Sequence, residues 1–242
     1  MMRRLAIFVE GYTELLFIDR LICEIAEKKH VAIQHRQIRG GGAKSGVPKK
    51  VIELQTPVLT SSLSLYFLIV DCGGDDQVRQ RIQEEHENLT TKGYERVIGL
   101  RDVYPNFTHA QIPTLKRGLR YGIKTSLTPV QFILSVMELE AWFLAEYSHF
   151  QHVDATLTVN TIRSQLGFDP ENDDMTSRLS PAKDLIDAYN LVGSAYKKGD
   201  PKATLDKLDY AHIYAVLPSR IPELKELIDA IDAFIEPSMP AL

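Results

Sequence analysis

The sequence is short of cysteine and has no hydrophobic run long enough to cross a membrane. Cys23 and Cys72 lie far apart, and no further cysteine stands at a zinc-binding spacing, which excludes a disulfide framework and a zinc site. The apolar run after Arg4 is broken at Glu10, so it is too short for a signal sequence. These absences predict a cytoplasmic protein with reduced thiols.

An excess of positive charge is missing as well. The 242 residues include 28 Lys and Arg against 32 Asp and Glu, which gives a net charge of -4. Nucleic acid would therefore be attracted by a local basic patch or through metal ions, because no general basic field exists. With 44% hydrophobic residues, the chain can bury one sizeable core and a smaller appendage.

Apolar runs of strand length alternate with amphipathic segments. Leu5–Val9, Leu65–Val70 and Arg96–Leu100 predict strands, and apolar residues at helical spacing predict helices between them. This alternation predicts an α/β fold with a mostly parallel sheet flanked by helices. Further strands are expected over residues 31–38 and 130–136, and helices over 15–26, 48–55, 77–91, 181–191, 202–216 and 222–234. We expect a sheet domain over residues 1–147 and a helical subdomain packed on it over residues 148–242.

Three of the predicted strands end in carboxylates, at Glu10, Asp71 and Asp102. Gly11 permits a tight turn from strand to helix, and Thr13 is expected to cap that helix. Any one of the carboxylates alone would more often be a cap or a turn residue than a ligand. Three at one edge of a parallel sheet would converge and repel unless a cation lay among them. The pattern therefore predicts a cation site at this edge.

Two motifs carry a resemblance to a known family. The segment Leu5–Glu14, with Glu10 and Glu14, resembles the first motif of the Toprim (topoisomerase-primase) fold, in the branch of the OLD (overcoming lysogenization defect) nucleases. Met137–Ala145, an apolar run with two glutamates beside the single tryptophan, resembles the Glu-Leu-Glu-Ala-Trp signature of small relatives of those nucleases. The resemblance implies a site for Mg²⁺ or Mn²⁺ whose ligands would be Glu10, Glu14, Asp71, Asp102, Glu138 and Glu140.

One position departs from the family pattern. Toprim proteins commonly have two aspartates separated by one residue after the third strand, whereas Gly73 occupies the second position after Asp71. Asp75 or Asp76 could substitute from the loop. Alternatively, Asp102 on the adjacent strand completes the site, and Asp71 is a neighbour of the ligands.

The resemblance also implies a lysine that approaches the scissile phosphate. Lys197 is the position that we match to it, with Lys198 second, although a solvated lysine pair before a turn glycine is an equal alternative. The predicted catalytic residues are thus Glu10, Asp71, Asp102, Glu138 and Lys197.

Basic side chains gather most densely over residues 115–124, which suits contact with a phosphate backbone or else forms a solvated helix face. The residues that we expect to contact nucleic acid are Lys44, Arg101, Lys116, Arg117, Arg120, Lys124 and Lys198. The glycines before Lys44 do not form a Walker A motif, because Ala43 precedes the lysine. That loop is either a phosphate contact or, more simply, a flexible connection.

These expectations favour a Mg²⁺- or Mn²⁺-dependent nuclease that acts on DNA, or on RNA. OLD-like relatives commonly act with an ATPase; since this chain has no Walker motif, a separate ATPase partner is expected, in phage defence. Topoisomerase and primase activities are disfavoured, since the chain has neither a separate tyrosine-bearing winged helix nor a zinc-binding cysteine set. The alternatives are a catalytically degenerate Toprim-like module that binds nucleic acid or a partner ATPase, and a flavodoxin-like protein whose strand-end acids are incidental.

Overall fold

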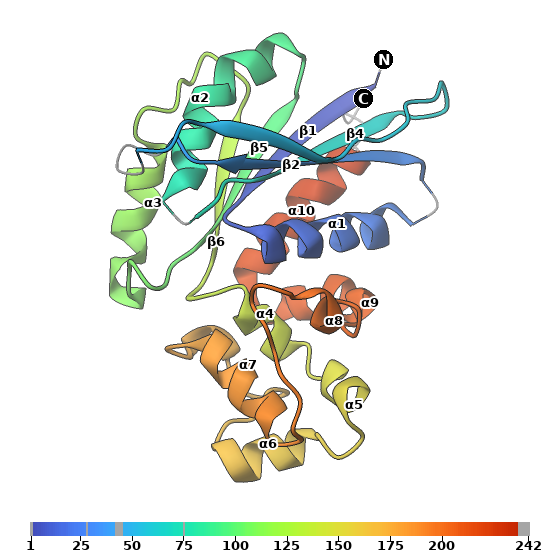
Figure 1. Cartoon of the computed structure of the whole chain (residues 1–242), viewed down its shortest axis with the longest axis vertical. Helices are drawn as coiled ribbons and strands as arrows, with labels where there is room; N and C mark the ends of the chain where they lie inside the picture. The colour runs from blue at the N-terminus through green and yellow to red at the C-terminus, as the bar shows by residue number, and fades with distance from the viewer. Residues whose placement is uncertain (1, 28, 42–45, 75, 237–242) are drawn as a thin grey trace, which may run out of the picture. The chain divides into compact units, whose positions relative to one another are not determined.

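A six-stranded sheet with the order β3-β2-β4-β1-β5-β6 forms the centre of the fold (Figure 1). The computed structural model describes residues 2–27, 29–41, 46–74 and 76–236. The strands are β1 (Arg3–Val9), β2 (Val31–Arg39), β3 (Lys50–Gln55), β4 (Leu65–Asp71), β5 (Arg96–Asp102) and β6 (Val130–Ser135). β1 is parallel to β4 and β5, and β2 is parallel to β4, so the predicted α/β fold with a mostly parallel sheet is confirmed.

Helices cover both faces of this sheet. Alternate residues of β1 serve the two faces: Ala6 and Phe8 belong to the core beneath α2 (Gln77–Thr91), whereas Leu5 and Ile7 point the other way. α1 (Tyr12–Ala26) and the C-terminal part of α10 (Pro222–Ile235) lie on one face, and α2 and α3 (Ile112–Arg120) lie on the other (Figure 1). Because both faces are covered, the central strands are apolar along their whole length, which is why their runs could be recognised in the sequence.

β3 is a strand, and the helix predicted over residues 48–55 is wrong. Lys50–Gln55 pairs antiparallel with β2, for example Arg39 with Lys50 and Ile38 with Val51. The strand lies at the sheet edge, and both Val51 and Leu54 are exposed. Pairing with β2 therefore stabilises this segment as a strand, and its hydrophobic periodicity does not distinguish a strand from a helix.

The chain divides into two compact units, which we treat separately. The sheet unit comprises the described residues of Met1–Arg101, Pro113–Leu134 and Asp229–Leu242, and the helical unit comprises Asp102–Ile112 and Ser135–Ile228. This division differs from the boundary predicted at residue 147. The reason is that the segment after β6, including α4, packs with α7 in the helical unit, whereas the end of α10 packs on the sheet.

The helical unit consists of short helices. They are α4 (Glu140–Ala145), α5 (His149–Val153), α6 (Val159–Leu166), α7 (Pro181–Asn190), α8 (Lys202–Leu205), α9 (Tyr210–Ala215) and most of α10, with 3-10 turns at His109–Gln111, Met175–Ser177 and Leu217–Ser219. The helix predicted over residues 202–216 is interrupted, because Asp209 starts a new helix by accepting the backbone N–H of His212 at 3.0 Å. The expected cap on α1 is also wrong: Gly11 occupies the N-cap position, and Thr13 lies inside the first turn.

None of the helices in the described ranges is long and apolar enough to span a bilayer.

Candidate functional site

Glu10 and Asp71 follow neighbouring strands of the sheet unit. Val9 on β1 is in register with Asp71 on β4, and the backbone N–H of Gly74 donates to the Glu10 carbonyl at 2.9 Å. Both side chains are buried, with 6% of Glu10 and 0% of Asp71 exposed. Two desolvated carboxylates therefore follow neighbouring strands of this sheet.

Each of these carboxylates already has a polar partner. The Arg101 guanidinium lies 3.9 Å from Glu10 Oε1 and also pairs with Asp76 at 3.1 Å. Asp71 accepts from the Gln37 amide at 2.6 Å and from the backbone N–H of Gly73 at 2.9 Å. Gln37 could not be predicted as a partner of Asp71, because a glutamine within a strand carries no recognisable motif.

Glu14 lies in the first turn of α1 and is also buried. Its Oε2 would lie only 3.2 Å from a Cβ added at Gly11, so the side chain folds back over the turn. Gly11 has an extended backbone with φ −152°, which any residue can adopt. A side chain at position 11 would therefore crowd Glu14, whereas the backbone conformation itself does not call for glycine.

Gly73 has a backbone conformation that disfavours an aspartate at this position. Its φ is +80°, in the left-handed region, and an added Cβ would lie 2.7 Å from the carbonyl oxygen of Ile38. An aspartate at this position would be strained and would collide with backbone. Of the two loop acids considered as substitutes, Asp76 is engaged with Arg101, and Asp75 lies outside the described residues.

Cys72, between Asp71 and Gly73, is buried. Burial raises the pKa of its thiol well above the usual value, and the negative charge of Asp71 adds to the effect. The thiol is therefore protonated, and it is not a reactive nucleophile.

A second group of carboxylates lies in the helical unit, around Asp102, Glu138 and Glu140. Asp102 accepts a hydrogen bond from the Ser135 hydroxyl and another from the backbone N–H of Leu139 at 3.1 Å. Met137 takes a left-handed conformation, with φ 63°, in the turn that leads to Glu138. This turn fixes Asp102 beside the segment that carries both glutamates.

Glu138 and Glu140 are buried, with 6% and 0% of their surfaces exposed. Glu138 Oε2 accepts the backbone N–H of Ala182 at 2.9 Å, in the first turn of α7, where negative charge is stabilising. Glu140 Oε1 accepts the Tyr196 hydroxyl at 2.7 Å. Glu140 Oε2 is buried and has no hydrogen-bond donor among the described residues. A wholly buried carboxylate oxygen without a donor is costly, so this atom is the one that most needs a cation.

Lys198 is the lysine that the structure places at these glutamates. Its ammonium lies 3.4 Å from Glu138 Oε1 and 3.6 Å from Glu140 Oε1. Lys197, the first choice from the sequence, is exposed and makes no side-chain hydrogen bond or ion pair with any described residue. Tyr196 was not predicted to take part, although it directly precedes the lysine pair.

The carboxylates do not form a closed coordination sphere. Among the described residues, no group of three or more His, Cys, Asp or Glu side chains is arranged to hold a metal ion. Around Glu138 and Glu140 the structure places two buried carboxylates, one of whose oxygens has no donor among the described residues, and the ammonium group of Lys198.

Most of the predicted nucleic-acid contacts lie on α3 and its continuation. Lys116, Arg117 and Arg120 are exposed, while Leu115 and Leu119 of the same helix are buried. Lys124 is exposed and pairs with Glu87. Two other candidates differ: Arg101 is buried in its contacts with Glu10 and Asp76, and Lys44 lies outside the described residues.

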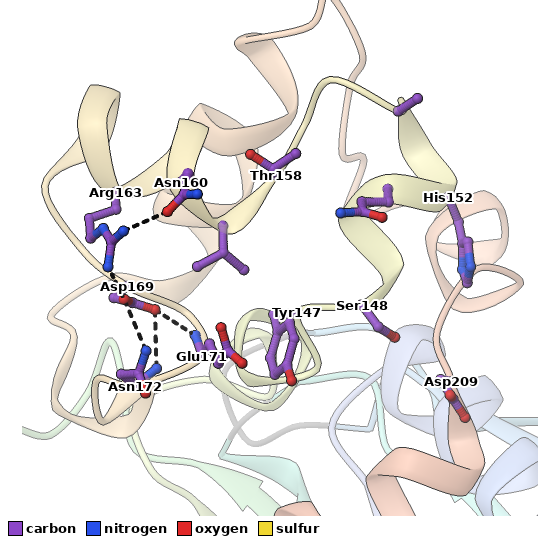
Figure 2. Close-up of a pocket in the computed structure, with 13 residues that line it drawn as sticks. Tyr147, Ser148, His152, Thr158, Asn160, Arg163, Asp169, Glu171, Asn172 and Asp209 are labelled. Carbon is purple, nitrogen blue, oxygen red and sulfur yellow. Dashed lines mark hydrogen bonds and ion pairs between the residues drawn. The ribbon is translucent and has the colours of Figure 1, made fainter.

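The helical unit also contains a cavity of about 870 Å³ (Figure 2). Tyr147, Asn160, Asp169 and Glu171 are among the side chains that line it. Asp169 accepts from Arg163 at 3.0 Å and from the backbone N–H groups of residues 171 and 172 at 3.0 and 3.1 Å. The acidic loop after Phe168 thus uses this carboxylate to close a turn.

A family model described as a domain of unknown function, DUF4276, matches residues 9–221. No curated protein and no solved structure matches the chain. The matched range contains both carboxylate groups and Lys198. Because the match extends over most of the sequence, the chain belongs to the DUF4276 family.

Proposed function

We propose that this protein is a nuclease that hydrolyses phosphodiester bonds of DNA, or of RNA, with Mg²⁺ or Mn²⁺. The observation that carries the proposal is the Glu140 carboxylate, which is wholly buried and has one oxygen without a donor. Oxygen atoms of carboxylates are the ligands that these hard cations prefer. The residues present therefore fit a divalent cation.

In this proposal Glu138, Glu140 and Asp102 hold the ion in the helical unit. Glu10, Glu14 and Asp71 form a separate group of candidate ligands within the sheet unit. When bound, Mg²⁺ or Mn²⁺ activates water and stabilises the leaving oxygen of a phosphodiester. Asp71 and Glu10 can bind a metal ion only if their contacts with Gln37 and Arg101 are broken.

The protein's own cations have two further roles in the proposal. Lys198, between Glu138 and Glu140, offsets negative charge that develops on the phosphate. The exposed cations Lys116, Arg117 and Arg120 bind the sugar-phosphate backbone without reading its sequence. Since the chain as a whole is acidic, the salt dependence of nucleic-acid binding should come from these three cations of α3.

The test is plasmid nicking in Mn²⁺ by the wild type, Glu10→Ala and Glu140→Gln. We expect Glu140→Gln to abolish nicking, and Glu10→Ala to abolish it as well. The matched control is Glu146→Gln, because Glu146 is equally buried in the helical unit but accepts the Ser148 and Asp209 backbone N–H groups at 3.2 and 3.3 Å. Full nicking by Glu140→Gln, or equal loss in Glu146→Gln with the fold intact, would refute the assignment.

A second candidate is a non-catalytic module that binds nucleic acid or a separate ATPase, and one observation favours it. Glu10 already lies beside Arg101 and Asp71 already accepts a hydrogen bond from Gln37, and the described residues contain no three-ligand metal group. This module would retard DNA in a salt-dependent manner without Mn²⁺ and without cleavage.

In either case we propose a cytoplasmic protein that works with a separate ATPase in phage defence. Co-purification from the native host without such an ATPase would count against that partner.

A further inference from the structure

A second cavity, of about 230 Å³, lies in the sheet unit beside residues of β1, β2 and β4. Arg4 near the beginning of β1, Arg36 on β2 and Lys92 after α2 line it, together with Tyr66 and Tyr94. Arg4 and Glu10 stand near opposite ends of β1, roughly 20 Å apart at the usual rise of a strand. None of the residues that line this cavity is one of the proposed metal ligands.

The charged side chains that line this cavity are all cationic. Arg36 has one ion-pair partner, Glu53, at 2.8 Å. Arg4 donates to the backbone carbonyl of Lys92 at 3.0 Å, and within the described chain neither Arg4 nor Lys92 forms an ion pair. Arg3, the neighbour of Arg4, shows the contrast, since Glu95 neutralises it at 2.7 Å. Arg4 and Lys92 are therefore two cations without an ion-pair partner among the described residues, and like charges at one cavity favour the binding of an anion.

Tyr66 and Tyr94 pack against each other on one side of this cavity. The Arg4 guanidinium lies 5.8 Å from the centre of the Tyr66 ring, and the Tyr94 ring meets Tyr66 edge-on at 6.5 Å. The Tyr66 hydroxyl donates to Gln34, which in turn donates to Glu53. Burial raises the pKa of both tyrosines, so their hydroxyl groups stay protonated. The guanidinium groups are thus held in place by packing and hydrogen bonds.

We propose that this cavity binds a small anion bearing a phosphate group, either inorganic phosphate or a phosphate monoester. Guanidinium groups match phosphate oxygens with paired N–H donors, and Lys92 adds a point charge from the rim. A compact anion fits the volume of the cavity, whereas a nucleic acid duplex does not. The inference does not depend on nuclease activity, because it uses none of the proposed metal ligands.

The test is calorimetric titration of the whole protein with inorganic phosphate in a phosphate-free buffer. Arg4→Gln and Lys92→Gln should each weaken binding by about tenfold, because each removes a charge-assisted contact. Lys50→Gln is the matched control, since Lys50 is an exposed cation of the same unit that does not line the cavity. Thermal unfolding of each variant checks that its fold is intact.

Two further titrations separate the sources of the phosphate. Ribose 5-phosphate that binds more tightly than inorganic phosphate would identify a monoester ligand, and the reverse order would identify the free ion. Absence of phosphate binding by the wild type, equal binding of acetate, or an equal loss in Lys50→Gln would overturn the inference.

Discussion

Replacing Glu140 by glutamine should make the metal-free protein more stable. Glu140 is wholly buried, and its carboxylate has two attractive partners, Tyr196 at 2.7 Å and Lys198 at 3.6 Å. The Lys198 side chain is 50% exposed, so solvent weakens its attraction. Glutamine keeps an acceptor for Tyr196 and removes the buried charge, but its amide lacks an acceptor. We expect a net gain of about 1 to 2 kcal/mol in the free energy of unfolding.

The same substitution should remove any stabilisation by Mn²⁺. A chain of this size changes its midpoint by about 2 to 4 °C for each kcal/mol. Saturation of the wild type at about 100 times the dissociation constant adds about 2.7 kcal/mol, which corresponds to a rise of about 5 to 11 °C. Thermal unfolding with and without Mn²⁺ should therefore show a large metal-linked rise in the wild type and none in Glu140→Gln.

Glu146→Gln serves as the control in this assay. Both oxygens of Glu146 accept backbone N–H groups, so an amide in its place should lower the midpoint while leaving the rise with Mn²⁺ unchanged. A Glu140→Gln variant that is less stable without metal and keeps the full rise with Mn²⁺ would refute the reasoning. In that case the orphaned oxygen would have no connection with a cation.

Three further predictions concern stability and reactivity. Gly73→Ala should cost about 2 kcal/mol or more, because φ is +80° and the new Cβ would meet the Ile38 carbonyl at 2.7 Å; an unchanged urea midpoint would contradict this. Iodoacetamide at mildly alkaline pH should label Cys23, which is exposed, and spare Cys72 until the chain unfolds; mass spectrometry that finds native Cys72 labelled would contradict its burial. Asp169→Asn should cost about 1 to 3 kcal/mol at neutral pH. Burial opposes ionisation of Asp169, but its hydrogen bonds outweigh that effect and lower the pKa below the usual 3.8, so the carboxylate stabilises the fold above that pH. The difference between wild type and variant should disappear as the pH falls through the lowered pKa, and a difference that persists in acid would contradict this.

The central parallel strands could be predicted, because long apolar runs of strand length fit few other structures. Strands such as Leu65–Asp71 are apolar on both faces, and that pattern survives without knowledge of neighbours. β3 could not be predicted in this way, since it is an exposed edge strand and depends on β2 for its hydrogen bonds. The break between α8 and α9 depends likewise on one capping aspartate within a continuous apolar pattern.

The candidate site was predictable in residue type and less so in geometry. The burial of Glu138 and Glu140 follows from the apolar residues around them, which the sequence displays. Whether Lys197 or Lys198 contacts the glutamates depends on the direction in which each side chain points from the loop. The sequence does not predict this direction, because neighbouring positions in a loop carry no periodic signal. The pairing of Arg101 with Glu10 joins residues that are distant in the chain, so no local pattern could reveal it.

The bond from Ala182 to Glu138 couples the candidate site to the folding of α7. A cation that drew charge from Glu138 would weaken the acceptor that now anchors the first turn of this helix. By reciprocity, a ligand that loosened the start of α7 would make Glu138 a better ligand for the cation. The Ala182 amide is therefore a natural reporter: its hydrogen exchange should quicken as metal binds, even though the amide itself touches no metal.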